Sequence, residues 1–138
     1  MSGPVKCELE EGSSLPKIPV LQGREDVNYK ICDEDSWRRA EAAGCFEGAP
    51  VDLADGYIHF STATQLRETA EKHFAGRSRL VLVAVEAEAL GPALRYEPSR
   101  GGDLFPHLYA PLPLSAVLWT CALPLGEDGR HVFPDAIP

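Results

Sequence analysis

The order of the expected elements predicts an α+β fold with a mixed or antiparallel sheet. Helices are expected only in the first 76 residues, and the later segments with a regular pattern are expected to be strands. Early helices followed by strands are typical of α+β domains. With 138 residues, the chain is long enough for one domain with one core and too short for two. We therefore expect a single small α+β domain.

The first expected strand, residues 27–32, alternates apolar side chains with polar or small ones. Asp33 or Asp35 can then cap a short helix, which is anchored by Trp37 and closed by Gly44 in a left-handed conformation. This pair of elements predicts that the domain begins with a strand that runs directly into a helix.

A loop over residues 46–53 and an Asp-Gly turn lead into a second strand and a second helix. Alternation along this strand places Ile58 and Phe60 on one face and Tyr57 and His59 on the other. The apolar pair is expected to face the core. His59 is therefore expected to face solvent or a cleft.

The second helix is expected to begin near Ser61 or Thr62 and to end at Gly76. Apolar residues at spacings of three and four form its core stripe: Ala63, Leu66, Ala70 and Phe74. The nearly continuous apolar run at residues 80–85 predicts a central strand that is covered on both faces. Further strands are expected at residues 93–97, 106–113 (or an extended loop there) and 116–123.

The composition of the two ends sets the expected domain boundaries. Residues 1–26 are rich in Gly, Ser, Pro and Glu and lack a sustained period, so we expect an irregular N-terminal extension. Residues 27–125 form the expected α+β domain. Residues 126–138 are expected to be a C-terminal tail, which can add an edge strand at residues 131–133.

The charge of the chain argues against double-stranded nucleic acid as a partner. The net charge is −8 and the pI about 4.9, whereas a duplex-binding surface needs clustered Lys and Arg. A local basic pocket for one nucleotide remains compatible with this charge. No apolar run approaches the length of a membrane span, so no membrane partner is expected.

The cysteines predict neither a metal site nor a secreted protein. Four cysteines are scattered without a Cys-x-x-Cys pair, which gives no support to a zinc site. No secretory signal opens the chain. We therefore expect free thiols and a cytoplasmic location.

Polar side chains that can carry chemistry collect at residues 59–62, 95–103 and 106–109. Arg100 can bind a phosphate or carboxylate in a forked geometry. His107 and Tyr109 can stack on a flat ring or donate hydrogen bonds. Gathered around one sheet, these groups favour a binding pocket.

Each of these residues also has a structural interpretation. Glu97 and Arg100 can simply pair with each other, Ser61 can cap the helix, and His59 can be a satisfied, half-buried side chain. Ser61 lacks the flanking glycines of a nucleophile elbow, and the chain has no phosphate-binding Gly-rich loop with its lysine.

Several separated motifs closely resemble, in order, the domain-of-unknown-function family 952. The resemblance runs from Tyr29 to Pro124, about two-thirds of the chain. The motifs that carry it are Tyr29-Lys30-Ile31, Trp37, Gly48-Ala49-Pro50-Val51-Asp52, Asp55-Gly56-Tyr57-Ile58-His59-Phe60-Ser61-Thr62, Arg95-Tyr96-Glu97-Pro98-Ser99-Arg100-Gly101-Gly102, Phe105-Pro106-His107-Leu108-Tyr109 and Pro111-Leu112-Pro113.

The fold of that family resembles the ADP-ribosyltransferases and the RNA 2′-phosphotransferases. This resemblance implies a split, mostly antiparallel sheet with two or three helices. In those enzymes an early strand ends in His, Gly and then Ser or Thr, and the His holds the ribose of NAD. His59-Phe60-Ser61 resembles this element, with Phe60 in place of the Gly. The resemblance therefore implies ribose contacts from His59, Ser61 and Thr62.

The same resemblance implies roles for residues nearer the end of the chain. Arg100 would contact a phosphate, and His107 and Tyr109 the nicotinamide ring or the acceptor side. The transferases carry a Glu on a late strand, which stabilises an oxocarbenium-like transition state. Residues 116–123 contain no carboxylate, so Glu97 is the candidate for this role, with His59 as its catalytic partner.

Together these observations predict a domain that binds NAD or a related small nucleotide, with ADP-ribosyl or glycosyl-type transfer as its reaction if it is an enzyme. NAD would be a substrate, and no tightly bound cofactor is expected. The alternatives are a non-catalytic small-molecule or protein-binding module on the same fold, and a polar set that only pins loops. The sequence makes no prediction of the oligomeric state.

Overall fold

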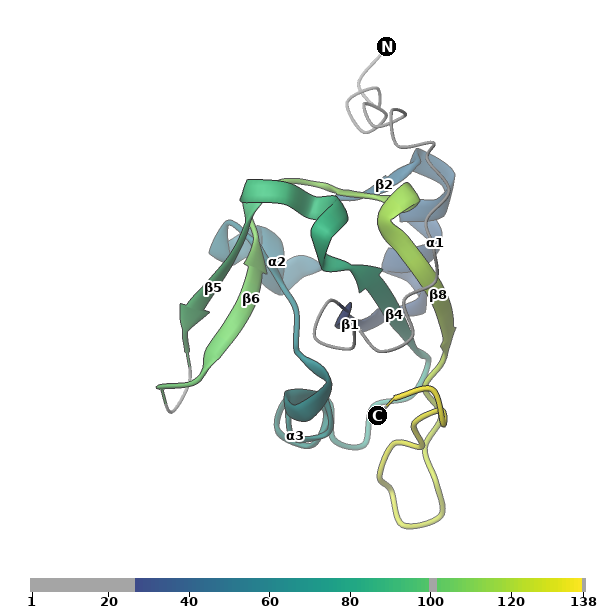
Figure 1. The fold of residues 1–138 in the computed structure, drawn as a ribbon. Helices are drawn as coiled ribbons and strands as arrows, with labels where there is room; N and C mark the ends of the chain where they lie inside the picture. The colour runs from purple at the N-terminus through teal and green to yellow at the C-terminus, as the bar shows by residue number, and fades with distance from the viewer. Residues whose placement is uncertain (1–26, 100–101, 138) are drawn as a thin grey trace.

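Strand β4 (Leu80–Glu86) is the centre of the largest sheet, where it lies between β1 (Val27–Asp33) and β8 (Val117–Ala122). Both pairings are antiparallel. The structure is a computed structural model, and it describes residues 27–99 and 102–137 (Figure 1). The predicted extension over residues 1–26 lies outside the described residues.

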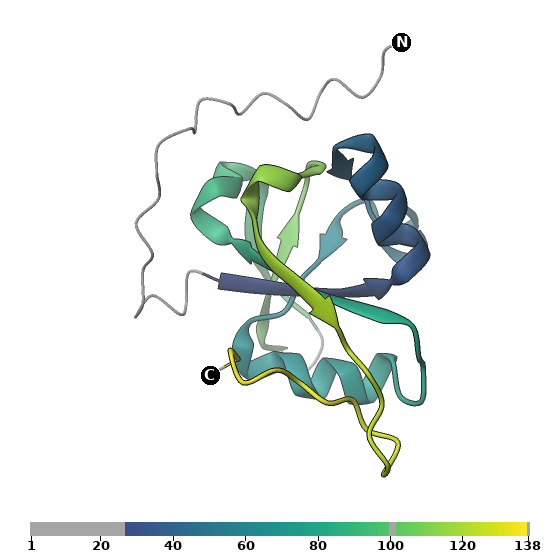
Figure 2. The same ribbon diagram turned by 90° about the vertical axis from the view of Figure 1, so that its right-hand side faces the viewer.

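The central strand is buried on both faces, as its apolar run predicts. Val83 and Val85 pack in one core cluster beside Trp37 of α1 (Glu34–Ala43). Leu80, Leu82 and Ala84 pack in a second cluster with the buried residues of α3 (Ala63–His73), Leu66 and Ala70. The two helices thus cover opposite faces of this sheet (Figure 2).

A second sheet is built from three antiparallel strands in the order β3 (Ile58–His59), β6 (Leu104–Leu108) and β5 (Leu94–Pro98). A backbone bridge between Tyr29 and Ser61 joins it to β1, with both N–O distances at 2.8 Å. Two-residue strands β2 (Cys45–Phe46) and β7 (Leu112–Pro113) form a third, antiparallel sheet. The described residues therefore form a small α+β domain with antiparallel pairing throughout.

The expected loop over residues 46–53 is wrong in its second half, which contains helix α2 (Pro50–Asp55). Pro50 occupies the start of the helix, where its fixed φ and missing N–H are tolerated. The carboxylate of Asp52 accepts the N–H of Ala49, and Gly56 ends the helix with a φ of 91°. Gly48 and Pro50, which are typical of loops, here precede and begin a short helix.

Between β4 and β5 the chain forms the 3-10 segment η3 (Ala87–Ala93), broken at Gly91, and η5 (Leu114–Ala116) precedes β8. The expected edge strand at residues 131–133 is reduced to an isolated bridge that pairs Leu125 with His131. The C-terminal segment nevertheless returns to the core, because Ile137 is buried in the cluster beneath the sheet.

Two further expectations concern the thiols and the membrane. Cys32 and Cys121 are free thiols, but Cys45 is disulfide-bonded, so the expectation of free thiols is wrong there. In the part of the chain that the structure describes, no helix combines the length and apolar content needed to cross a membrane.

Candidate functional site

One face of the three-stranded sheet carries a row of polar and aromatic side chains. The register pairs His59 of β3 with His107 of β6, and His107 with Arg95 of β5. Because successive side chains in a strand alternate between faces, these three residues lie side by side on one face. The opposite face carries Ile58, which is buried in the core as alternation predicts.

Tyr57 holds the aromatic groups of this face together. Its ring stacks on His107 with a centroid distance of 4.2 Å and an interplanar angle of 28°. It also lies 4.7 Å from the ring of His59 and 5.2 Å from the ring of Tyr109. The guanidinium of Arg95 lies 5.1 Å from the Tyr109 ring, a cation–π contact at the outer edge of the cluster.

The buried carboxylate of Asp52 fixes the position of His59. Oδ1 of Asp52 lies 2.6 Å from Nδ1 of His59 and also accepts the backbone N–H of His59 at 3.1 Å. A carboxylate only accepts hydrogen bonds, so Nδ1 carries the proton in this contact. The ring is therefore held in one orientation from the side that faces the protein.

Lys30 of β1 neutralises Asp52. Its Nζ lies 2.9 Å from Oδ1 and 2.8 Å from Oδ2, and the two side chains are 5% and 1% exposed. Burial alone would raise the pKa of Asp52, but hydrogen bonds from His59 and Lys30 and the Lys30 charge outweigh it and lower that pKa to about 2. Asp52 is thus a charged carboxylate at neutral pH that links β1, α2 and β3.

A second carboxylate reaches the other nitrogen of His59. Oδ2 of Asp55, the last residue of α2, lies 2.9 Å from Nε2. The side chain of His59 is 27% exposed and that of Asp55 46%. Both ring nitrogens therefore face carboxylate oxygens, one buried and one at the surface.

Glu97 lies further along the same face and is already occupied by two donors. Its Oε1 lies 2.7 Å from Nδ1 of His107 and 2.7 Å from the hydroxyl of Tyr109. These hydrogen bonds, from His107 first and then Tyr109, lower the pKa of Glu97, and the bond to Glu97 raises the pKa of Tyr109. His107 itself is buried.

A cleft of about 470 Å³ opens beside His59. It lies between strand β3 on one side and β1 and α3 on the other. This volume is in the usual range for small-molecule sites. Its walls come from β1, α2, β3 and α3, and from Ser99, the residue that follows β5. The polar side chains that line it are Lys30, Asp55, Tyr57, His59, Ser61, Thr69, His73, Arg77 and Ser99.

The structure brings together some of the predicted site residues and separates others. His59 and Ser61 line the cleft, and the Ser61 hydroxyl donates to that of Thr69 at 3.1 Å. Thr62 is the N-cap of α3, in a capping box with Gln65, and does not line the cleft. His107, Tyr109 and Glu97 form the hydrogen-bonded group beyond Tyr57, and Arg100 lies outside the described residues.

A family model described as "Protein of unknown function (DUF952)" matches residues 31–120. The chain belongs to the DUF952 family. The chain also resembles protein CC0527 from Caulobacter crescentus, with which it shares 52% sequence identity. Superposition on the crystal structure of CC0527 gives a TM-score of 0.74 and covers 77% of this chain and 93% of that one. The solution NMR structure of CC0527 gives 52% identity and a TM-score of 0.69, over 76% and 90% of the two chains. No curated protein matches the chain.

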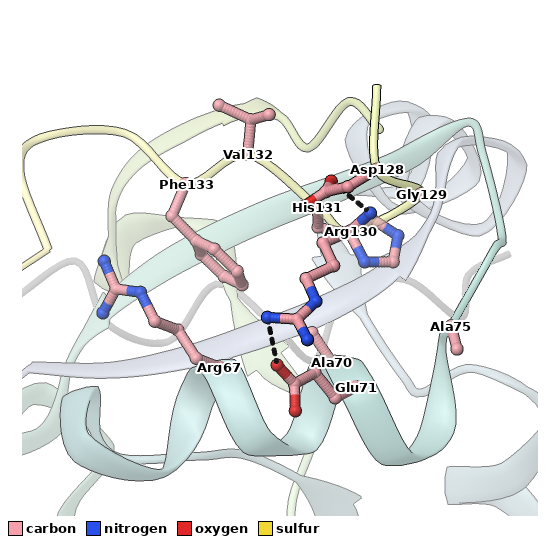
Figure 3. A pocket seen from close by; sticks show the side chains of 10 residues that line it. All are labelled: Arg67, Ala70, Glu71, Ala75, Asp128, Gly129, Arg130, His131, Val132 and Phe133. Carbon is pink, nitrogen blue, oxygen red and sulfur yellow. Dashed lines mark hydrogen bonds and ion pairs between the residues drawn. The ribbon is translucent and has the colours of Figure 1, made fainter. Parts of the chain in front are cut away.

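This DUF952 chain has a second hollow, of about 550 Å³, between α3 and the C-terminal segment (Figure 3). Arg130 lies 3.8 Å from Glu71 there, and the guanidinium of Arg67 lies 5.1 Å from the centre of the Phe133 ring. The hollow shares no lining residue with the cleft at His59 and contains none of the predicted site residues. The Asp128 side chain accepts the backbone N–H of Arg130 at 3.0 Å in the same hollow.

The sequence analysis did not identify Lys30 and Asp52, the buried pair that holds His59 in this candidate site. Alternation placed Lys30 opposite the apolar residues of its strand, on a side expected to be polar. No local signal in the sequence indicates that Lys30 and Asp52 meet, because they are 22 positions apart. Across residues 27–99 and 102–137, no group of three or more His, Cys, Asp or Glu could hold a metal ion.

Proposed function

We propose that this DUF952 domain binds NAD or a related small nucleotide in the cleft beside His59. The observation that carries the proposal is the fixed imidazole at the cleft wall. Asp52 holds Nδ1 from the buried side, and Nε2 is directed to the exposed side, where its partner is the half-exposed carboxylate of Asp55. A preoriented histidine of this kind recognises a hydroxyl or phosphate oxygen with little loss of side-chain entropy.

The rest of the cleft supplies the chemistry that a nucleotide needs. Tyr57 offers an aromatic ring for stacking, and the Ser61 hydroxyl offers a polar contact beside His59. Arg77 provides a cationic group on the same cleft, a role that the sequence assigned to Arg100. The resemblance of His59-Phe60-Ser61 to the ribose-binding element of ADP-ribosyltransferases supports the same ligand class.

If the domain is an enzyme, the reaction breaks the C1′–N bond of NAD, nicotinamide leaves with the bonding electrons, and C1′ is joined to an acceptor nucleophile (water or a hydroxyl of a second substrate) that loses its proton to solvent. His59 would orient the ribose. Glu97 lies on the same face of the sheet but does not line the cleft, and it is the carboxylate that the resemblance assigns to the developing positive charge at the anomeric carbon. His107 and Tyr109 hold the Glu97 carboxylate in its charged form, which suits that role.

The test is a titration with NAD, ADP-ribose and nicotinamide while thermal unfolding is followed. A ligand at about 100 times its Kd adds about 2.7 kcal/mol of stability. We expect NAD and ADP-ribose to stabilise the wild type, and His59→Ala to abolish the effect. Arg67→Ala, in the separate hollow, should leave the effect intact. The absence of any nucleotide-dependent shift in the wild type would rule out the proposal.

A binding module without catalysis is the second candidate. The observation that favours it is the sequence of β8, VLWTCA, which contains no carboxylate, together with the two donors already bound to Glu97. Chromatography for free nicotinamide separates the two candidates. Binding of NAD without release of nicotinamide would identify the module, whereas release that is lost in Glu97→Gln would identify the transferase.

A further inference from the structure

His59 lies between two carboxylates that differ sharply in their surroundings. Asp52 is 1% exposed at its side chain and faces Nδ1 at 2.6 Å. Asp55 is 46% exposed and faces Nε2 at 2.9 Å. The same imidazole therefore has one partner inside the protein and one at the surface.

A network of hydrogen bonds holds the Asp52 carboxylate in one orientation. Both oxygens accept from the ammonium of Lys30, and Oδ2 also accepts the N–H of Ala49. Oδ1 in addition accepts the backbone N–H of His59. Rotation of Asp52 away from His59 would break these bonds inside the protein, where an unpaired charge is expensive.

The Asp55 contact has no such support. Its bond to Nε2 is the one hydrogen bond that the described residues give to this side chain, and Asp55 lines the cleft. It is the last residue of α2, next to Gly56 at a φ of 91°. A half-exposed carboxylate at a helix end can rotate into water at little cost.

We propose that the two carboxylates have opposite roles in ligand binding. Asp52 is a positioning residue that holds the His59 ring, and Asp55 occupies the place at Nε2 that an acceptor oxygen of the ligand takes on binding. This inference rests on the proposed function for its ligand class, a ribose hydroxyl or a phosphate oxygen of a nucleotide. Asp55 is then a built-in competitor of the ligand.

The contacts of the four groups support the displacement. Lys30 pairs with Asp52, and the 2.9 Å contact of Nε2 with the Asp55 carboxylate places an N–H at Nε2, because a carboxylate only accepts hydrogen bonds. When Asp55 rotates away, His59 presents an N–H to the cleft without its acidic partner. A neutral hydroxyl or an anionic oxygen can accept this N–H in place of the carboxylate, whereas a group without an acceptor atom, such as an ammonium, cannot.

The first experiment needs no ligand and follows the ring nitrogens of His59 by ¹⁵N NMR in the free protein. Asp55→Ala should change the signal of Nε2 and leave that of Nδ1 in its protonated position. Asp52→Asn should change Nδ1. An Asp52→Asn spectrum with Nδ1 unchanged would overturn the positioning role.

Because Asp52→Asn leaves Lys30 buried without a counter-charge, the double variant Lys30→Met/Asp52→Asn provides a second route. It removes both charges of the buried pair together and replaces the carboxylate beside Nδ1 by a neutral amide. The same change at Nδ1 is expected in this variant. An unchanged Nδ1 in a folded double variant would contradict the positioning role just as clearly.

The second experiment measures affinity by calorimetry, with ADP-ribose, adenosine and inorganic phosphate as probes. Asp55→Ala should bind ADP-ribose about 3- to 10-fold more tightly, and the double variant about 10-fold more weakly. Tighter binding of adenosine identifies a ribose oxygen as the displacing group, and tighter binding of phosphate identifies a phosphate oxygen. An unchanged or lower affinity in Asp55→Ala would overturn the competition.

Asp35→Ala is the matched control, since Asp35 lies on α1 with its carboxylate 3.7 Å from Arg79 and does not line the cleft. It loses the same charge and should leave the affinity unchanged. The gain in Asp55→Ala should persist at 1 M salt, where long-range charge effects are screened within about 3 Å. If no probe binds to any variant, the proposed function fails together with the competitor role, and the NMR result alone decides the positioning role.

Discussion

The ammonium of Lys30 lies 2.8 Å from Oδ2 of Asp52, and both side chains are almost fully buried. The two residues belong to β1 and α2, so this ion pair joins the large sheet to the helix that precedes His59. Breaking a buried pair by removing one partner is costly because the other charge remains inside. The pair therefore contributes to the free energy of unfolding of the domain and to the position of the His59 ring.

Replacement of Lys30 by Met should destabilise the domain by about 3 to 5 kcal/mol, because it leaves the Asp52 carboxylate buried without a partner. Urea unfolding measures the change. Lys72→Met is the control, since Lys72 pairs with Glu68 at 3.1 Å on the surface, and it should cost less than about 1 kcal/mol. The double variant Lys30→Met/Asp52→Asn should recover part of the loss; equal losses in the single and double variants would contradict the pairing.

Acid should weaken the domain through Asp52. Its folded pKa of about 2 lies below its ordinary value of 3.8, so in this range the unfolded state binds more protons. The stabilisation, about 2 kcal/mol, is fully present above about pH 4 and is lost as the pH falls toward 2. Urea unfolding between pH 6 and pH 2 measures it. The double variant without the pair should lack this loss, and an identical pH profile would contradict the assignment.

The parts of the fold that the sequence predicts well are those governed by one-dimensional patterns. Alternation correctly turned Ile58 into the core and His59 toward a cleft. The apolar run of β4 correctly predicted a strand covered on both faces. In both cases the side chain's environment follows from its position in its own element, so a local pattern is enough.

The parts that the sequence did not predict depend on contacts between distant residues. Lys30 and Asp52 are separated by 22 positions, and neither pattern around them indicates that they meet. Helix α2 has only six residues, too few for a hydrophobic period. The orientation of His59 could be predicted, but the partner that fixes it could not.

Substitution of Gly48 measures how closely the loop before α2 packs against Asp52 of that helix. Its φ is +127°, and a Cβ at this position would lie 2.8 Å from Cβ of Asp52. Gly48→Ala should therefore cost about 2 to 4 kcal/mol, from strain and from displacement of Asp52. Gly44→Ala is the control, because Gly44 has a φ of +92° with nothing within 4 Å of a Cβ.

Thermal or urea unfolding should give about 1 kcal/mol for Gly44→Ala. Only Gly48→Ala should also shift the ¹⁵N signal of Nδ1 of His59, because only this change pushes on the carboxylate that holds the ring. Equal losses of unfolding free energy in the two variants, with unchanged His59 signals, would show that position 48 does not pack tightly against Asp52.

Removal of the Tyr109 hydroxyl should raise the pKa of Glu97. The hydroxyl donates to Oε1 at 2.7 Å and, after His107, is a main cause of the lowered pKa. Tyr109→Phe keeps the ring beside Tyr57 and Arg95 but removes this donor, so the charged carboxylate loses one stabilising bond. Carboxyl ¹³C NMR during an acid titration measures the change.

Tyr96→Phe is the control for this change, because the Tyr96 hydroxyl accepts from Asn28 and does not contact Glu97. It should leave the Glu97 pKa where it is in the wild type. The direction matters for the proposed site, since a carboxylate that stabilises positive charge must stay ionised. A Glu97 pKa that stays the same in Tyr109→Phe would mean that His107 alone keeps the carboxylate charged.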